Sequence, residues 1–358
     1  MSLPDRKYSS SPTMQIGNRI IGEGHPTYII AEIGVNHNGI LELALELIDI
    51  AVRAGADAVK FQKRNLANLY SRKYLENANT GEKSLRYLLP ILQQVELPHE
   101  AFDKINEYCK KQGITFLCTP FDPQSADFLD QLEVPAFKVA SADLTNLPLI
   151  DHLILKNKPL ILSTGMSRME EVDFTVNFLK ERNSEFALLH CNSTYPAAFE
   201  DINLLFMNRL KEYGVPVGYS GHERGIAVST VAAVMGASII ERHLTLDRTM
   251  DGPDHAASLE PQGFQKMVRD IRQVFLALGT GTEKFFSRGE ILNREVLAKS
   301  LVAARRIEPG EVITSQMIAV KSPALGLSPQ NYTRLAGRSA ERVIEEDEHV
   351  RIYGSNHG

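Results

Sequence analysis

The sequence predicts an α/β fold: a (β/α)8 barrel of the TIM type, followed by a small β-rich domain. Between Ile29 and Ile239, eight short apolar runs alternate with helical patterns at about thirty residues per repeat. The runs are almost continuously hydrophobic, as expected of parallel strands that are buried on both faces. After Gly279 the pattern changes to short strand-like pieces separated by turn signals. These observations leave little room for an all-α or an all-β fold.

The predicted barrel strands are rich in β-branched and other apolar residues. They span Tyr28–Ala31, Ala58–Gln62, Thr115–Cys118, Ala136–Val139, Leu160–Ser163, Ala187–Cys191, Val217–Ser220 and Ile239–His243. Most of the intervening stretches carry apolar residues at three- and four-residue spacing, which is typical of helices that pack one face on a sheet. They include Leu41–Arg53, Pro98–Gln112, Pro123–Leu132, Met169–Glu181 and Ile226–Met235.

Two segments depart from the repeat. The interval Lys63–Ile114 is much longer than the others, and we expect a loop that covers the active face together with one or two helices. Before the first strand, Met14–Gly22 resembles a short hairpin that closes the bottom of the barrel.

The chain therefore divides into three predicted parts. Residues 1–282 form the barrel domain, with an N-terminal hairpin at about residues 14–27, and residues 283–298 form a linker. Residues 299–358 form the β-rich module, whose strand-like pieces are Ser300–Ala304, Val312–Ile313, Ile318–Val320, Arg342–Val343 and Val350–Ile352.

The composition excludes several classes of protein. The 358 residues carry a net charge of −5, which gives no general field for nucleic acid or anionic membranes. The three cysteines lack CxxC spacing, so neither a disulfide framework nor a zinc site is expected, and a reducing cytoplasm fits best. The N-terminal segment lacks the apolar core of a signal peptide. The longest apolar stretch, Ala227–Ile240, is shorter than the ~20 residues of a membrane span.

In a (β/α)8 barrel the reacting groups come from the C-terminal ends of the strands and from the loops that follow. These positions are unusually polar in this sequence. They include Glu32, Lys60, Gln62, Thr119, Lys138, Ser141, Ser163, Thr164, Gly165, His190, Ser193, Tyr195, Ser220, His222, Glu241 and His243.

Two of these residues, Lys60 and Lys138, lie within apolar strand runs. A buried ammonium group is costly unless it meets an anion. One interpretation is that both lysines pair with carboxylates of the barrel. The other is a phosphate or carboxylate pocket, completed by hydroxyl groups at the ends of neighbouring strands. The hydroxyl candidates are Thr119, Ser141, Ser193 and Ser220.

His222 and His243 end the seventh and eighth strands, so both imidazoles can reach one ion. Each lies beside a carboxylate, Glu223 or Glu241, and no cysteine is close in sequence. Two nitrogen ligands without a thiolate favour a six-coordinate Mn²⁺ or Mg²⁺, completed by water and substrate oxygens, over structural zinc.

Long motifs in this order and spacing closely resemble the sialic acid synthase family, the phosphoenolpyruvate-dependent nonulosonic acid synthases. They are AEIGVNHNG, GADAVKFQ, FLCTPFD, FKVASADLTNLPLI, KPLILSTGMS, LLHCNSTYP, VGYSGHERG, IERHLTLDRTMDGPDHAASLEP and SLVAARRIEPGEVIT. The last belongs to a C-terminal SAF (antifreeze-like, β-clip) domain. The resemblance runs from about Met14 to Ile352.

The resemblance implies a metal-dependent condensation of phosphoenolpyruvate with an open-chain N-acylamino sugar such as N-acetylmannosamine, with release of phosphate. Phosphoenolpyruvate would bind Lys60, Thr119, Lys138, Ser141, Ser193 and Ser220, and Mn²⁺ or Mg²⁺ would bind His222 and His243. Gln62, Asp143, Tyr195 and Asp254 would face the sugar. Glu32 and Glu241 would join the histidines as catalytic groups. The family is typically a domain-swapped homodimer.

Two residues depart from the family pattern. Asp143 stands where members that act on N-acetylmannosamine commonly have Glu, and Ser322 stands where an arginine of the SAF domain commonly reaches the sugar's acylamino group. A legionaminic acid synthase acting on a 2,4-diacetamido-6-deoxymannose is therefore an alternative. Another phosphoenolpyruvate-dependent 3-deoxy sugar acid synthase would need a second basic cluster for a sugar phosphate. A non-catalytic sugar-binding protein would leave the lysines and histidines without a use.

Overall fold

The computed structural model describes residues 12–76, 83–279, 281 and 283–352. The chain divides into two compact units, Met1–Thr280 and Gly281–Gly358, and each is described by itself. The first unit is a closed barrel of eight parallel strands in the order β10-β3-β4-β5-β6-β7-β8-β9. The predicted (β/α)8 barrel is therefore confirmed.

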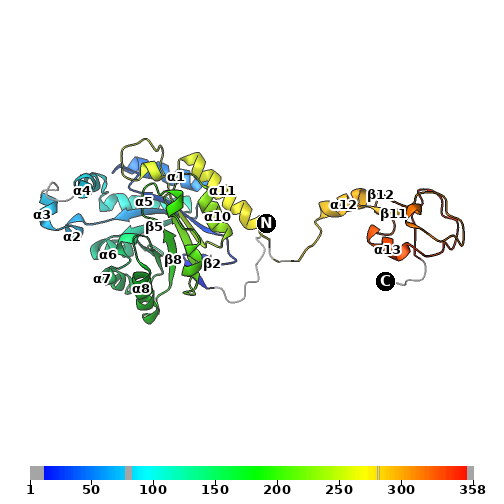
Figure 1. Ribbon diagram of the computed structural model, residues 1–358. Helices are drawn as coiled ribbons and strands as arrows, with labels where there is room; N and C mark the ends of the chain where they lie inside the picture. The colour runs from blue at the N-terminus through cyan, green and yellow to red at the C-terminus, as the bar shows by residue number, and fades with distance from the viewer. Residues whose placement is uncertain (1–11, 77–82, 280, 282, 353–358) are drawn as a thin grey trace. The chain divides into compact units, whose positions relative to one another are not determined.

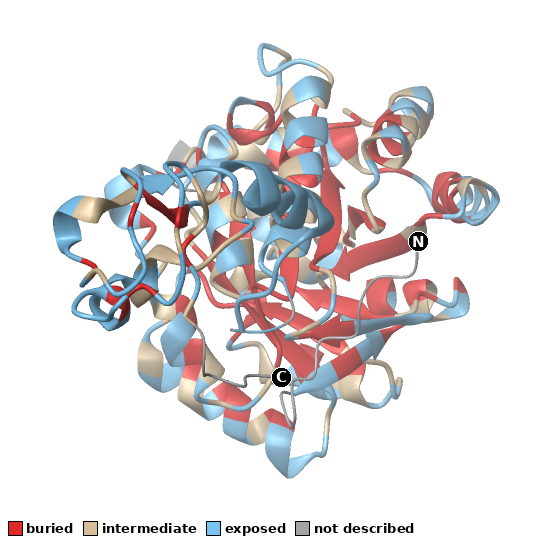
Figure 2. Ribbon diagram, turned by 90° about the vertical axis from the view of Figure 1, so that its right-hand side faces the viewer, coloured by how far each residue is buried: buried red, intermediate tan, exposed pale blue. Residues whose placement is uncertain are grey.

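The eight barrel strands agree with the predicted runs to within a few residues. They are β3 Tyr28–Gly34, β4 Ala58–Lys63, β5 Thr115–Pro120, β6 Phe137–Val139, β7 Leu160–Ser163, β8 Phe186–Cys191, β9 Val217–Gly221 and β10 Ile239–His243. Nearly every residue in them is buried (Figure 2). This burial on both faces explains why the strands read as continuous apolar runs.

Helices surround the barrel (Figure 1). They are α1 Leu41–Ala54, α5 His99–Gln112, α6 Pro123–Gln131, α7 Leu147–Ile154, α8 Met169–Glu181, α9 Phe206–Lys211, α10 Ala227–Val234 and α11 Pro261–Ala277. Local signals fix their ends. The Asp122 side chain accepts a hydrogen bond from the backbone N–H of Ser125 and caps α6, and Gly55, at φ +82°, ends α1.

An antiparallel hairpin closes the N-terminal end of the barrel. Its strands are β1 Thr13–Ile16 and β2 Arg19–Gly22. Met14, Ile16 and Ile21 are buried in one apolar cluster with residues that point inward from the barrel strands. The hairpin is thus an apolar plug, as the segment Met14–Gly22 suggested.

The long interval between β4 and β5 contains more helices than expected. Besides α5 it has α2 Leu66–Leu69, α3 Arg72–Glu76 and α4 Lys83–Val95, which project to one side of the barrel (Figure 1). Short 3-10 helices lie in other loops: η2 Ser141–Asp143, η3 Phe199–Asp201 and η4 His255–Ala257. We refer to residues 64–97 as the β4–α5 insertion.

The second unit has its own small core, formed by residues such as Leu301, Ile313 and Ile344. Its elements are α12 Arg288–Leu297, β11 Ser300–Ala303, η5 Ser315–Met317, β12 Ile318–Lys321, η6 Pro329–Asn331 and α13 Tyr332–Leu335. Most of the segment 283–298, predicted to be a linker, forms α12, which a Ser287–Glu290 capping box begins. Of the three further predicted strand pieces, Val312–Ile313 contains one isolated bridge, at Val312, and the other two pieces each lie next to one, at Ile344 and His349.

No helix in the described parts of the chain is long and apolar enough to cross a membrane. The three cysteines, Cys109, Cys118 and Cys191, are free and buried.

Candidate active site

A cavity of about 610 Å³ lies at the C-terminal ends of the barrel strands. All fourteen residues predicted for the site line it, although they come from seven different strands and the loops that follow. They are Glu32, Lys60, Gln62, Thr119, Lys138, Ser141, Asp143, Ser193, Tyr195, Ser220, His222, Glu241, His243 and Asp254. Their individual roles stay predictions.

The period-two geometry of the strands explains this convergence. Inside the barrel, one layer of side chains belongs to the apolar cluster that the hairpin closes, and the next layer lines the cavity. The residue pairs, two positions apart, are Ile30/Glu32, Ala58/Lys60, Leu117/Thr119, Ala136/Lys138, Ile161/Ser163, Leu189/Cys191 and Ile239/Glu241. We call the second members of these pairs, together with Ser220, the polar layer.

Lys60 is paired with carboxylates. Its Nζ lies 2.7 Å from Glu32 Oε2 and 3.8 Å from Glu241 Oε1, and it donates a hydrogen bond to Thr119 Oγ1 at 3.0 Å. Burial works against the ammonium form, but the two carboxylates outweigh it and raise the pKa of Lys60. The carboxylate-pairing interpretation therefore holds for this lysine.

Lys138 differs. It donates to Ser163 Oγ at 2.7 Å and to the backbone oxygen of Val139 at 2.9 Å, and no described carboxylate lies within 4.0 Å of its Nζ. Burial lowers its pKa. A buried cation without a paired anion is the arrangement expected at an anion site.

Gly165 brings two of the predicted serines together. A Cβ atom added to this glycine would stand 2.3 Å from Ser193 Oγ and 2.8 Å from Ser141 Oγ. Both hydroxyl groups therefore lie against the same stretch of backbone after β7. The sequence analysis placed Gly165 among the strand ends but gave it no role, although a glycine there is a signal for close approach of the backbone to a ligand.

The two carboxyl groups at Lys60 have different pKa values. Burial raises the pKa of Glu32 to about 7; Lys60 opposes this effect and Glu241 adds to it. Burial also disfavours the Glu241 carboxylate, but Lys60 and Lys138 outweigh it and lower its pKa. Ser220 donates a hydrogen bond to Glu241 Oε1 at 3.1 Å. Two neighbouring carboxyls with separated pKa values can divide proton transfer and charge stabilisation between them.

The two histidines can act as ligands of a metal ion. His222 donates from Nδ1 to the backbone oxygen of Asn192 at 2.6 Å, because a carbonyl can only accept, and this leaves the Nε2 lone pair free. Its ring centroid is 5.3 Å from that of His243. Burial lowers the pKa of His243 far below its usual value, so this ring is neutral.

The residues present fit an ion that keeps open coordination positions. Within the described ranges, no group of three His, Cys, Asp or Glu side chains could hold a metal. His243 Nδ1 has no hydrogen-bond partner among the described residues and lies 3.6 Å from Asp254 Oδ2. With two histidine ligands, water or substrate must supply the other donors, as the sequence analysis expected for Mn²⁺ or Mg²⁺.

The predicted sugar-facing residues lie beside this group. Gln62 donates from Nε2 to Glu32 Oε1 at 3.0 Å, and the Tyr195 ring is 4.0 Å from the His222 ring. Asp143 receives a hydrogen bond from Asn146 on Oδ1, whereas Oδ2 is buried without a partner among the described residues. Burial raises the pKa of Asp143.

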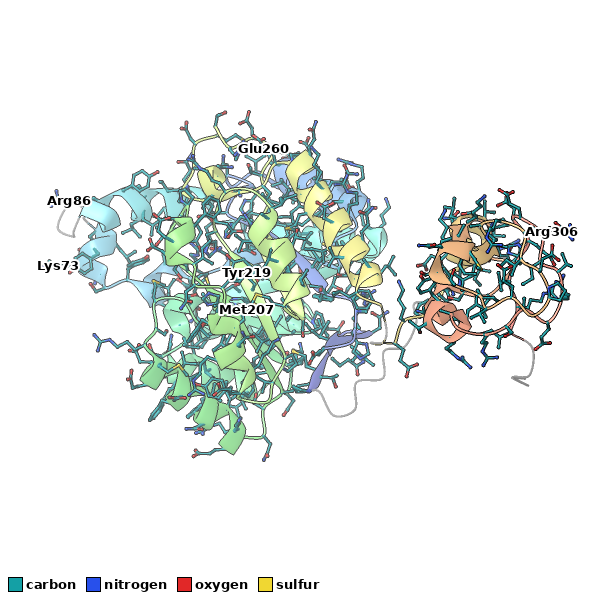
Figure 3. All side chains as sticks on the ribbon, turned by 45° about the vertical axis from the view of Figure 1, so that its right-hand side comes forward. Lys73, Arg86, Met207, Tyr219, Glu260 and Arg306 are labelled. Carbon is teal, nitrogen blue, oxygen red and sulfur yellow. The ribbon has the colours of Figure 1, made fainter. Side chains whose placement is uncertain are left out.

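Two residues near strand ends lie outside the cavity. His190 points outward, with Nε2 2.6 Å from the backbone oxygen of Ile202, so its inclusion among the polar strand ends was wrong in structural terms. Glu223 is fully buried against Arg242, 2.6 Å away, and accepts from Tyr219, which is labelled in Figure 3. This ion pair joins the ends of β9 and β10 behind the two histidines.

Several cavity residues had not been singled out. Arg64 and Cys191 are polar, and several of the apolar residues come from the β4–α5 insertion. The apolar residues include Val35, Leu69, Leu88, Leu92 and Phe121. Arg64 follows β4 directly, but the analysis of strand ends stopped at Gln62. The apolar residues give no sequence signal, because their segment has no strand register.

Models of two protein families match the chain. The NeuB family model matches residues 47–283, and the SAF domain model matches residues 298–352.

Known relatives extend over nearly the whole chain. It is 41% identical over 334 residues to the N,N'-diacetyllegionaminic acid synthase of Campylobacter jejuni, and this alignment covers 91% of this chain and 99% of the relative. It is 37% identical over 345 residues to the human N-acetylneuraminate-9-phosphate synthase, covering 95% and 96%. Among solved structures, the N-acetylneuraminic acid (sialic acid) synthetase of Leptospira borgpetersenii in complex with citrate has a TM-score of 0.70 and 35% identity, covering 80% of this chain and 98% of the other.

Proposed function

Because the chain belongs to the NeuB family of sialic acid synthases and carries an SAF domain, we propose that it condenses phosphoenolpyruvate with an open-chain N-acylamino sugar and releases phosphate. The relatives support a nonulosonic acid synthase, a transferase that forms a carbon–carbon bond. One observation supports this choice of substrates. A single cavity holds Lys138, which has no carboxylate partner, on one side, and the carboxyls at Lys60 together with the two histidines on the other.

Phosphoenolpyruvate is the anionic substrate. Lys138, which lacks a carboxylate partner, attracts it, and Ser141 and Ser193 donate hydrogen bonds beside Gly165. Lys60 on β4 and Thr119 on β5 follow from Lys138 along neighbouring strands, and Ser220 on β9 completes the set. Since the chain has a net charge of −5, these local groups and not a general field hold the substrate.

The sugar occupies the side of the cavity lined by Gln62, Asp143, Tyr195 and Asp254. His222 and His243 hold Mn²⁺ or Mg²⁺, and a bound ion supplies Lewis-acid polarisation of the aldehyde oxygen. C3 of phosphoenolpyruvate then forms a bond to the aldehyde carbon, and positive charge develops at C2.

The carboxyls at Lys60 complete the reaction. Glu241, whose low pKa keeps it ionised, stabilises the charge at C2. A water molecule adds to C2, and ionised Glu32 accepts its proton. The bond between C2 and the phosphate oxygen then breaks while the new C2 hydroxyl loses its proton and becomes the ketone, and phosphate leaves toward Lys138 with that proton. The proton held by Glu32 passes to the oxygen of the former aldehyde. The products are the nonulosonic acid and inorganic phosphate.

A second candidate is the synthesis of a legionaminic acid from a 2,4-diacetamido-6-deoxymannose. The 41% identity to a synthase named for N,N'-diacetyllegionaminic acid favours it. Asp143 and Ser322, which depart from the pattern of synthases that use N-acetylmannosamine, agree with this alternative.

The experiment measures phosphate release from phosphoenolpyruvate with Mn²⁺ and a panel of sugars. The panel contains N-acetylmannosamine, its 6-phosphate and the 2,4-diacetamido-6-deoxymannose, and mass spectrometry identifies the product. We expect turnover with an unphosphorylated acylamino sugar. Phosphate release with none of these sugars, under conditions in which the protein is folded, contradicts the proposal.

The metal assignment has its own test. His222→Ala should abolish metal-dependent phosphate release and weaken Mn²⁺ binding measured by electron paramagnetic resonance. His25→Ala, which changes an exposed histidine far from the cavity, is the matched control. Full turnover by His222→Ala contradicts the assignment. The homodimer and the cytoplasmic location stay predictions; sedimentation velocity of the full chain tests the first.

A further inference from the structure

Arg64 is a buried cation that the proposed reaction does not use. It is 6% exposed, it lines the cavity, and it follows β4 at the start of the β4–α5 insertion. Its side chain donates one hydrogen bond, from Nη2 to Gln62 Oε1, and its guanidinium lies 4.6 Å from the centroid of the Phe121 ring. Its Nε has no hydrogen-bond partner among the described residues.

A guanidinium in this state lacks acceptors. It has five N–H donors, and the described part of the chain offers its side chain a neutral amide and an aromatic face but no carboxylate within 4.0 Å. A desolvated donor without a partner costs free energy in the folded protein. A ligand oxygen that enters the cavity beside Arg64 recovers part of this cost.

The groups around Arg64 indicate which kind of ligand oxygen it can bind. The carboxylates of Glu96 and Asp254 already act on its charge, and Glu96 is also bound by Lys63. These negative charges oppose a phosphate dianion. Leu69, Leu88 and Leu92, which belong to the same insertion as Arg64, also line the cavity, and we call them the leucine wall. A hydrogen-bond donor, Arg64, together with the leucine wall fits a carbonyl group that carries a methyl group.

Gln62 links this region to the reacting centre. Its amide oxygen accepts from Arg64, and its amide nitrogen donates to Glu32 at 3.0 Å. In an acylamino sugar aldehyde the acylamino group is on C2, next to the aldehyde carbon. A group recognised one side chain away from Glu32 therefore matches the C2 substituent.

We propose that Arg64 and the leucine wall form the acyl subsite, in which Arg64 donates a hydrogen bond to the carbonyl oxygen of the sugar's acylamino group. This inference rests on the proposed synthase function and adds a specificity-determining residue to it. Removing Arg64 then weakens recognition of the acyl group but leaves the phosphoenolpyruvate side of the cavity intact.

The test compares Arg64→Met with the wild type on N-acetylmannosamine and on mannose, which lacks the acylamino group. We expect kcat/KM for N-acetylmannosamine to fall about 30-fold, that for mannose to change less than about threefold, and the KM of phosphoenolpyruvate to stay unchanged. Arg72→Met makes the same chemical change at an exposed arginine of the same insertion and should leave all three values unchanged.

Three outcomes overturn the acyl subsite: an equal loss on both sugars, no loss on either, or a preference of the wild type for N-acetylmannosamine 6-phosphate that Arg64→Met removes. The last indicates an anion subsite instead. A wild type that turns over no sugar contradicts the proposed function. In that case saturation-transfer NMR of the N-acetyl methyl group, with wild type and Arg64→Met, still decides the subsite: equal transfer to both proteins overturns it.

Discussion

The two ends of the barrel are built from the same strands but satisfy their buried groups differently. At the N-terminal end, Met14, Ile16 and Ile21 of the hairpin complete an apolar cluster. At the C-terminal end, two residues further along each strand, the side chains are charged or polar, and Glu241 Oε2 and Asp143 Oδ2 lack partners among the described residues. The first end contributes stability, whereas the second gives up stability to hold ligands.

The substitution Lys138→Met at the C-terminal end should have the largest effect on activity. We expect kcat/KM for phosphoenolpyruvate to fall about 10³-fold, or about 4 kcal/mol. The free energy of unfolding should stay equal or rise, because Lys138 has no carboxylate partner that the substitution would leave buried and unpaired. Enzyme kinetics and urea unfolding measure the two quantities. Lys158→Met, which removes a surface lysine paired with Asp130, is the control. A variant that still saturates normally with phosphoenolpyruvate contradicts the anion site.

The opposite result is expected at the other end of the barrel. Ile21→Ala leaves a hole in the apolar cluster and should lower the free energy of unfolding by about 3 kcal/mol. The KM of phosphoenolpyruvate, measured well below the unfolding transition, should change less than about twofold. Ile20→Ala, at the exposed neighbouring position, is the matched control. A large change in KM without loss of stability would break the division between the two ends.

A smaller effect is expected where the backbone of Gly165 approaches two serine side chains of the cavity. Gly165→Ala places a methyl group against Ser141 and Ser193 and should raise the KM of phosphoenolpyruvate about 30-fold, or about 2 kcal/mol. Gly263→Ala, in α11, meets no atom closer than 3.9 Å and serves as the control. An unchanged KM in Gly165→Ala would remove the two serines from the substrate site.

The smallest effect concerns pH. Since the pKa of Glu32 is about 7 in the folded protein and 4.5 in an unperturbed carboxyl, the folded state binds the extra proton between these values. The stability of the metal-free wild type should therefore fall relative to Glu32→Gln as pH rises from about 4.5 to about 7, by on the order of 1 kcal/mol. Parallel unfolding curves across this range would show that Glu32 does not titrate there.

The polar layer could be predicted from the sequence because strands repeat every two residues. Lys60, Lys138 and Glu241 interrupt apolar runs, and the strand order of a barrel brings them together. The pairing of each lysine could not be predicted, since it depends on side-chain distances across the barrel. Lys60 pairs with Glu32 and Lys138 does not pair with a carboxylate.

Other parts of the site were beyond sequence reasoning for a different reason. Leu69, Leu88 and Leu92 belong to the β4–α5 insertion, whose path is set by packing and not by strand register. In the second unit, α12 begins at a capping box, Ser287 with Glu290, which the sequence contained but the linker assignment passed over.

The two-residue step between the apolar cluster and the polar layer bears on how this enzyme can be altered. A library that randomises only the polar layer changes reactive groups while every side chain of the apolar cluster is retained. A larger fraction of the variants in such a library should fold than in an equally large library that randomises both layers. The same separation would let a lineage of such barrels exchange one substrate for another in single mutational steps without first acquiring compensating mutations.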